Sequence, residues 1–79
     1  MENNAIINSR LKDLLDVMDA RIHINIFIYE GAGQKCIMAA EVYKILCMPS
    51  FMDKYKNFEV VGLNLGLVTN ILIEEVKRL

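Results

Sequence analysis

Few residues in this sequence are of types that perform chemistry, and they do not combine into a catalytic or metal-binding set. His23 is the single histidine, and its ordinary pKa of about 6.5 suits proton transfer. Catalysis by proton transfer also needs a partner group, and no Ser/His/Asp, Cys/His or paired-carboxylate spacing supplies one. Cys36 and Cys47 lie far from a Cys-x-x-Cys spacing, so we expect reduced thiols in the core without a metal. The sequence therefore predicts a binding protein without a cofactor rather than an enzyme.

Residues suited to binding a ligand surround one short segment. A cation, an imidazole and an aromatic ring share one face of residues 21–29, and this combination suits a small anionic ligand. The glycines that follow leave backbone amides accessible in a turn, and a lysine comes soon after them. Scattered surface charge and an ordinary hairpin turn explain the same residues, so both alternatives stay open. The predicted ligand-binding residues are Arg21, His23, Tyr29, Gly31, Gly33 and Lys35.

Residues 21–29 form the clearest element, because their side chains alternate with the period of a β-strand. We expect one face of this strand to form the core through Ile22, Ile24, Ile26 and Ile28. The opposite face adds Asn25 and Phe27 to the residues named above. It is too polar for a core and too aromatic for ordinary solvent exposure, so we expect it to contact a partner. Residues 30–34 then predict a turn.

An amphipathic helix precedes this strand and ends near Asp19. Its apolar residues recur at helical spacing, with charged residues on the other face. Asn8 or Ser9 can cap its first turn, although Asn3 or Asn4 could start the helix a turn earlier. The apolar positions are Ile7, Leu11, Leu14, Leu15 and Met18.

The middle of the chain allows two interpretations. Residues 35–48 suit both a strand and a helix, and the preceding turn favours a hairpin strand over residues 35–43. Pro49 predicts the start of a short helix that continues to Tyr55.

Residues 58–65 and 67–75 predict two further strands, with a helix as the alternative for the second of them. We therefore predict a single α+β domain over residues 1–79. Its N-terminal helix packs on a small antiparallel sheet of three or four strands, and residues 21–29 form a central strand.

Composition limits the partners of this chain. Its 79 residues are 54% hydrophobic with a formal net charge of −1, and the pI is ≈ 5.7. A nucleic-acid-binding protein is normally basic and a DNA mimic strongly acidic, so we expect neither. No apolar run is long enough to cross a bilayer, and we expect a cytoplasmic protein without a membrane partner. One small core cannot bury so many apolar side chains, so we predict a homo-oligomer, a dimer or larger.

The apolar, proline-interrupted residues 46–52 are the predicted interface, because such a stretch does not suit a regular core element throughout. Methionines adapt readily to irregular contacts. The predicted interface residues are Leu46, Met48, Phe51 and Met52.

Two segments resemble parts of small uncharacterised α+β proteins from phages and mobile elements of low-GC Gram-positive bacteria. In that group a helix similar to residues 11–18 precedes a strand, and a segment similar to residues 58–63 precedes the last strand, with Tyr where this chain has Phe58. The resemblance implies a compact accessory protein of the kind that a phage uses against host defence. Such proteins sequester a nucleotide signal between identical subunits or block a host protein. We predict sequestration of a small nucleotide-derived signal, with inhibition of a host defence protein through an apolar surface as the alternative.

Overall fold

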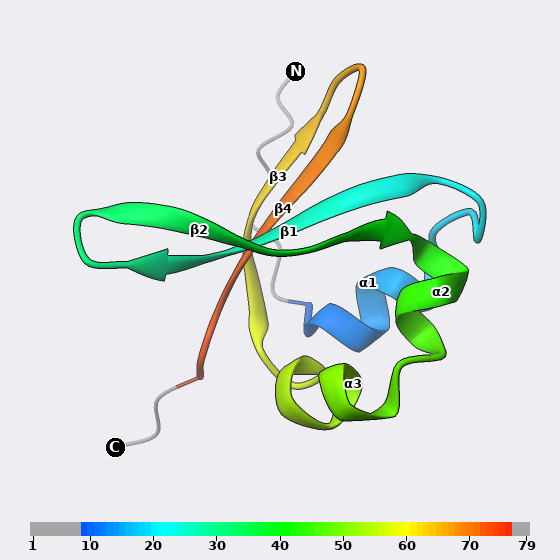
Figure 1. Ribbon diagram of the computed structural model, residues 1–79, viewed down its shortest axis with the longest axis horizontal. Coiled ribbons are helices and arrows are strands. Elements are labelled where there is room, and N and C mark those ends of the chain that lie inside the picture. Colours follow the sequence, from blue (N-terminus) through cyan, green and yellow to red (C-terminus); the bar gives the residue numbers. More distant parts are fainter. Residues whose placement is uncertain (1–8, 77–79) are drawn as a thin grey trace.

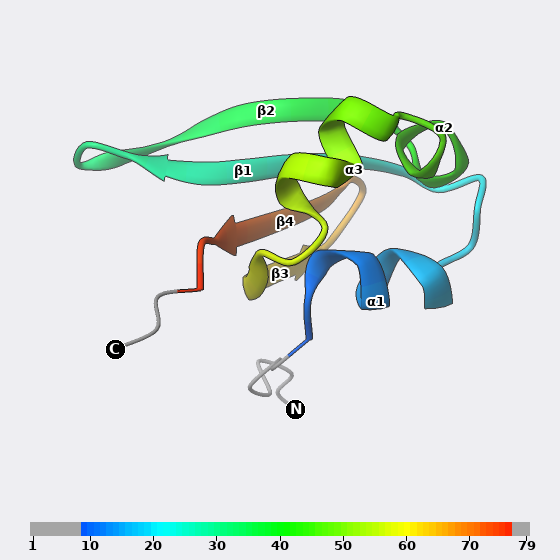
Figure 2. The same ribbon diagram turned by 90° about the horizontal axis from the view of Figure 1, so that it is seen from below.

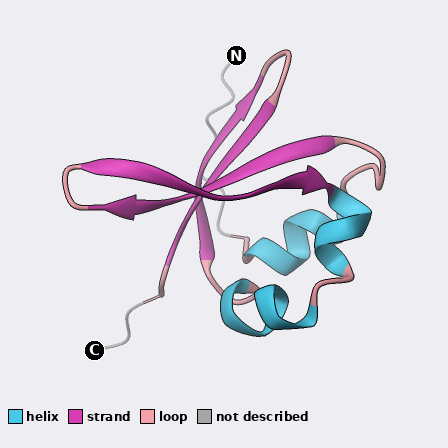
Figure 3. Cartoon of the chain, viewed as in Figure 1, coloured by secondary structure: helices cyan, strands magenta, loops and turns pink. Residues whose placement is uncertain are grey.

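The computed structural model of this chain describes residues 9–76 and shows an α+β fold, as predicted (Figure 1). Helices and strands are distinguished by colour in Figure 3. The elements in chain order are α1 (Leu11–Val17), β1 (His23–Glu30), β2 (Gly33–Glu41), α2 (Val42–Leu46), α3 (Pro49–Tyr55), β3 (Glu59–Leu65) and β4 (Thr69–Glu74).

The four strands form one mixed sheet in the order β2-β1-β4-β3. β1 pairs with β2 and β3 pairs with β4 in antiparallel hairpins, whereas β1 and β4 run parallel. The prediction of a wholly antiparallel sheet is therefore wrong for the central pair of strands, β1 and β4. The connection from β1 to β4 contains β2, two helices and β3, which is long enough for the crossover that a parallel pair requires. β1 lies in the middle of the sheet, as predicted for residues 21–29.

The core lies between one face of the sheet and the three helices. Buried and less buried residues alternate along β1 and β4, so the buried side chains of these strands share that face. The helices lie together beside one half of the sheet, and the ends of both hairpins extend beyond them (Figures 1 and 2). The buried apolar residues are Leu11, Leu15, Ile24, Ile26, Val42, Ile45, Met52, Val60, Ile71 and Ile73.

The isoleucine face of β1 is the core face, as predicted, with one exception. Ile24 and Ile26 are fully buried, and Ile28 packs partly buried against the core. Ile22 precedes β1 and is 39% exposed. Its backbone is nevertheless held, because the Ile22 carbonyl accepts a hydrogen bond of 3.0 Å from the Val42 N–H.

α1 is shorter than predicted, because the chain just before it is extended. Ser9 does not cap the helix. Instead its carbonyl accepts a hydrogen bond of 2.8 Å from the Val60 N–H, and Arg10 pairs in antiparallel register with Glu59. Arg10 takes the N-cap position in a β conformation without a side-chain cap. The other predicted capping residues, and Ile7, lie outside the described residues.

Residues 35–48, for which the sequence allows a strand or a helix, contain one after the other: the end of a strand and then a helix. β2 continues to Glu41, which confirms the hairpin, and the helical pattern then applies to α2. Val42 and Ile45 of α2 are buried, so the helical spacing places both side chains in the core. α3 begins at Pro49 as predicted, and the last element is the strand β4 rather than a helix.

The turn between β1 and β2 contains Gly31 and Ala32. Gly31 has φ of +60°, which glycine adopts without the steric cost that a side chain adds. This confirms the predicted glycine turn and fixes a two-residue hairpin loop. Across residues 9–76, no helix combines the length and the apolar character needed to cross a membrane.

Candidate binding surface

One face of the sheet carries the core, and the other, which we call the open face, has no helix packed on it within residues 9–76. Its central positions alternate with the buried residues along each strand and are half-buried or exposed. This is the face of β1 that the sequence predicts as a contact surface. Apart from Glu41, Glu59 and Glu74 at its two ends, the open face consists of His23, Asn25, Phe27 and Tyr29 of β1, Gln34, Cys36 and Ala39 of β2, Gly62 and Asn64 of β3, and Asn70 and Leu72 of β4.

Three asparagines form a row across the open face. Asn25 is the register partner of Asn70 on β4, and Asn70 is the register partner of Asn64 on β3. The Asn25 side-chain amide donates a hydrogen bond of 3.0 Å to the Asn70 side-chain oxygen. Since each amide has two donor hydrogens and a carbonyl oxygen, one mutual bond leaves further donors and acceptors for a partner.

An apolar row runs beside the asparagines. Phe27 on β1 is the register partner of Leu72 on β4, which is in turn the partner of Gly62 on β3. A Cβ atom added at Gly62 would lie 3.2 Å from the Leu72 Cβ, so the missing side chain makes room for the leucine. Phe27, Leu72 and the amides of Asn64 and Asn70 line a shallow hollow of about 300 Å³.

Charge is confined to the two ends of the open face. His23 and Glu41 are register partners at one end, and Glu59 and Glu74 are partners at the other. A hydrogen bond with its own backbone, and a second with the Lys44 ammonium 3.3 Å away, hold the pKa of the Glu41 carboxyl below its ordinary value. The centre of the face therefore offers an aromatic ring, aliphatic groups and amides, but no net charge.

The predicted ligand-binding residues are not brought together. Tyr29 lies six positions along the extended strand from His23, a span of roughly 20 Å. Arg21 lies beyond His23, where its side chain is 88% exposed and its Nε is 3.7 Å from an Asp19 carboxylate oxygen. Gly31, Gly33 and Lys35 lie at the opposite end of the hairpin, and the Lys35 Nζ is 4.0 Å from a Glu30 carboxylate oxygen. A small ligand cannot touch both groups within one chain.

The predicted interface residues 46–52 do not form a continuous surface. Met52 belongs to the core, and Phe51 packs against the core with its ring 4.8 Å from that of Tyr55. Leu46 is exposed and Met48 is half-buried. The helical spacing of α3 turns the two largest side chains inward, which is why this segment loses its apolar surface.

The cysteines lie on the surface, and their predicted burial in the core is wrong. Cys36 and Cys47 are both free and exposed. Cys36 is the register partner of Phe27 at the border of the open face, and its thiol lies 3.5 Å from the Met38 carbonyl. Among residues 9–76, no three His, Cys, Asp or Glu side chains lie close enough to share a metal ion.

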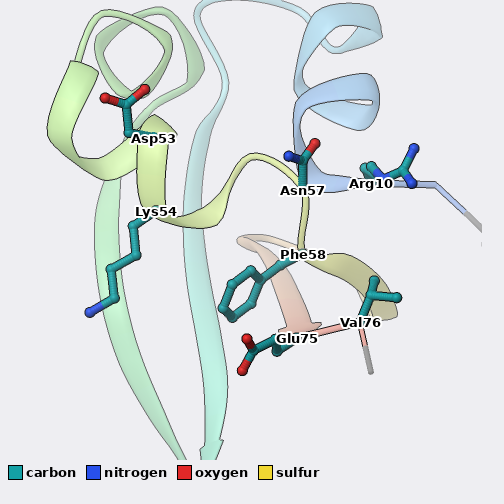
Figure 4. Close-up of a pocket in the computed structure, with 7 residues that line it drawn as sticks. All are labelled: Arg10, Asp53, Lys54, Asn57, Phe58, Glu75 and Val76. Atoms are coloured by element: carbon teal, nitrogen blue, oxygen red, sulfur yellow. The ribbon is translucent and has the colours of Figure 1, made fainter. Parts of the chain in front are cut away.

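Two further hollows flank Phe58 at the other end of the sheet. One, of about 320 Å³, is lined by Arg10, Lys54 and Glu75 among others (Figure 4). Figure 4 shows the Lys54 ammonium pointing away from Arg10, so the two cations do not converge on one ligand. The other, of about 330 Å³, lies between Tyr29 and Tyr55 and again includes the carboxylate of Glu75. Glu75 lines both hollows, with Asp53 in the first and Glu74 in the second, and these carboxylates make this end of the sheet unsuited to an anion.

The end of β3 and the loop that connects it to β4 carry an apolar patch that the predicted sites omitted. Leu65 is 71% exposed, Leu67 is fully exposed and Val68 is 45% exposed. The signal is present in the sequence, because no charged residue occurs between Glu59 and Glu74. An uncharged apolar loop tip that extends beyond the core is typical of a contact surface.

No family model, curated protein or solved structure matches this chain. Its function has to be argued from the open face and the two hairpins.

Proposed function

We propose that this protein is a non-catalytic protein-binding module that docks a partner protein on its open face. The observation that carries the proposal is the central row of Phe27, Leu72 and Gly62, an apolar strip on a sheet face that no described helix covers. Interfaces of this kind combine a desolvated apolar centre with a polar rim. The asparagine row supplies such a rim.

The proposed partner surface is apolar and uncharged at its centre, with hydrogen-bonding groups beside it. A charged surface would lose its hydration against Phe27 and Leu72 without gaining an opposite charge. An uncharged surface loses little hydration free energy, and its polar groups can form hydrogen bonds with the remaining donors and acceptors of the Asn64 and Asn70 side chains. The exposed Leu65 and Leu67 extend the same contact beyond the sheet.

This proposal favours the second of the two functions considered from the sequence, inhibition of a host protein, and moves its contact surface from residues 46–52 to the open face. The resemblance to phage proteins suggests counter-defence as the setting. The binding mode we propose does not depend on that setting.

Site-specific photo-crosslinking tests the proposal. A photoreactive phenylalanine derivative at Phe27 should crosslink a host protein stoichiometrically when the chain is expressed in its native host. The same group at Lys12, which is exposed on α1, is the matched control and should give no such adduct. Adducts at position 12 alone, or no protein adduct at position 27, would contradict the proposal.

The sequestration of a small nucleotide-derived ligand remains the second candidate, favoured by the hollow of about 300 Å³ on the open face. That volume lies at the lower limit of small-molecule sites, and Phe27 could stack on a base. Calorimetry against cyclic and ADP-ribose-type nucleotides tests it directly. Binding that Phe27→Ala weakens and Arg21→Ala leaves unchanged would place such a ligand on the open face. Loss of binding in Arg21→Ala and Tyr29→Ala would restore the site predicted from the sequence.

A further inference from the structure

The hollow of about 330 Å³ beside α3, which we call the aromatic hollow, combines side chains that attract a cation. The aromatic residues Tyr55 and Phe58 line it, and Glu74 and Glu75 line it with carboxylate side chains. The face of an aromatic ring carries partial negative charge and attracts ammonium and guanidinium groups. The rings and the carboxylates therefore favour the same class of ligand, an organic cation.

The two rings of the aromatic hollow are held in place before any ligand binds. The Phe58 N–H donates a hydrogen bond of 3.0 Å to the Tyr55 carbonyl, and the Phe58 carbonyl accepts one of 2.8 Å from the Leu11 N–H. The rings of Tyr55 and Phe58 lie edge to face with centroids 4.9 Å apart, and the Phe51 ring packs against Tyr55 at 4.8 Å. A ligand therefore gains the contact with these rings without the entropic cost of ordering them.

A lysine of this chain already contacts one of the rings. The Lys54 Nζ lies 5.3 Å from the centroid of the Tyr55 ring, and Lys54 lines the same hollow. Figure 4 shows the Phe58 ring and the Glu75 carboxylate pointing to the same side as Lys54, away from Arg10. Among the ion pairs within residues 9–76, none includes Lys54 or Glu75. An exposed ammonium held by a ring alone is bound weakly, so a cation that also pairs with a carboxylate can displace it.

The sheet adds an aliphatic surface to the aromatic hollow. Ile28 of β1 and Ile73 of β4 are register partners, and both line the hollow. An inorganic cation gains nothing from these isoleucines. An arginine side chain uses every part of the site, because its aliphatic stem packs on apolar groups while its planar guanidinium stacks on a ring and binds a carboxylate through two parallel hydrogen bonds.

We propose that the aromatic hollow binds an arginine side chain presented by another polypeptide. The guanidinium lies against Tyr55 and Phe58 and pairs with Glu75, and the Lys54 ammonium leaves the ring when the arginine binds. The site is separate from the uncharged centre of the open face, so the proposal holds whether or not a partner also docks there.

Titration of the full-length chain with N-acetyl-arginine methylamide, followed by NMR, tests the class of ligand. The methyl signals of Ile28 and Ile73 and the ring signals of Tyr55 and Phe58 should shift saturably, with a Kd of about 1–10 mM for a single side chain. The citrulline derivative has the same shape without the charge and is the matched control, with sodium chloride added to equal ionic strength. It should leave these signals unchanged. Equal shifts with citrulline, or none with arginine up to about 50 mM, would overturn the proposal.

Two charge variants locate the bound guanidinium. Glu75→Gln should weaken binding of the arginine derivative about threefold, because the paired carboxylate is lost. Lys54→Met keeps an unbranched apolar side chain but removes the competing ammonium, and it should tighten binding by a similar factor. Both side chains are exposed, so neither substitution should alter the fold.

The matched controls are Glu41→Gln and Lys44→Met, which change the net charge in the same two ways. Glu41 pairs with His23 at the other end of the sheet, and the Lys44 Nζ lies 3.3 Å from its carboxylate. Screening by salt removes most of the effect of so distant a charge, so each control should change the Kd by less than about 1.5-fold. Effects as large as those of Glu75→Gln and Lys54→Met would show that net charge rather than the aromatic hollow attracts the ligand, and would overturn the proposal.

Discussion

The two faces of this sheet are built from the same strands and have opposite characters. Ile26 of β1 lies fully buried under the helices, whereas the next residue, Phe27, lies half-buried on the open face. The same change occurs along β4 from Ile71 to Leu72. The buried strand residues of the covered face are aliphatic except for Thr69, whereas the open face mixes a ring, amides and one thiol. The difference teaches that the covered face serves stability, while the open face is free to serve contact.

The largest expected effect separates these two roles. Ile26→Ala removes a side chain with no exposed surface and should lower the free energy of unfolding by about 2–5 kcal/mol. Leu72→Ala removes a half-buried side chain of the open face and should cost only about 1 kcal/mol. Urea unfolding followed by circular dichroism measures both values. Equal losses would show that an unseen layer covers the open face.

The sequence predicted the local elements well because their signals are local. The alternation along β1 marks a strand, Pro49 marks a helix start, and Gly31 marks a turn with positive φ. It did not predict the parallel pairing of β1 with β4, because hairpin signals concern neighbours in sequence, whereas this pairing joins segments far apart in the chain. A strand's hydrophobic pattern also does not reveal its direction relative to its partner.

The candidate surface was predictable only in part for the same reason. The alternation in β1 indicates an outward face that contains Asn25 and Phe27. Their neighbours Asn70 and Leu72 belong to a strand whose position follows only from the sheet order. That residues 46–52 do not form one continuous surface could not be predicted either, because an apolar stretch alone does not tell which side chains turn inward. Met52 becomes core through the helical spacing of α3.

A smaller effect on the free energy of unfolding is expected from the hydrogen bond within the asparagine row. Asn25→Ala and Asn70→Ala each remove one partner of a half-buried hydrogen bond of 3.0 Å and should each cost about 1 kcal/mol. The double variant should cost less than the sum, with a coupling energy of about 0.5–1.5 kcal/mol.

The matched control for this cycle is Asn64→Ala combined with Asn70→Ala. Asn64 shares the open face with Asn70, but the Asn70 side-chain oxygen accepts its hydrogen bond from Asn25. We expect these two variants to be additive within about 0.5 kcal/mol. Coupling as strong as that of Asn25 would mean that the hydrogen bond can move between strands, and the row would then be less ordered than the structure shows.

The smallest effect concerns the charged end of the open face. The Glu41 carboxylate is stabilised by its own backbone and by Lys44, and its pKa is lowered in the folded chain. A lowered folded pKa means that the ionised form favours folding. This contribution is therefore fully present above the ordinary pKa of a glutamate and is lost as the pH falls through the lower, folded value.

Glu41→Gln removes the charge, so the melting temperature of this variant should lie slightly below that of the unaltered chain at pH 7. The difference should shrink as the pH approaches about 3, because the carboxyl is then increasingly protonated in both states. Since Lys44 and Glu41 are largely exposed, added salt should reduce the difference at pH 7 as well. Thermal unfolding at both pH values, with and without salt, measures these shifts. A difference that stays constant with pH would show that Glu41 acts through packing beside His23 rather than through its charge.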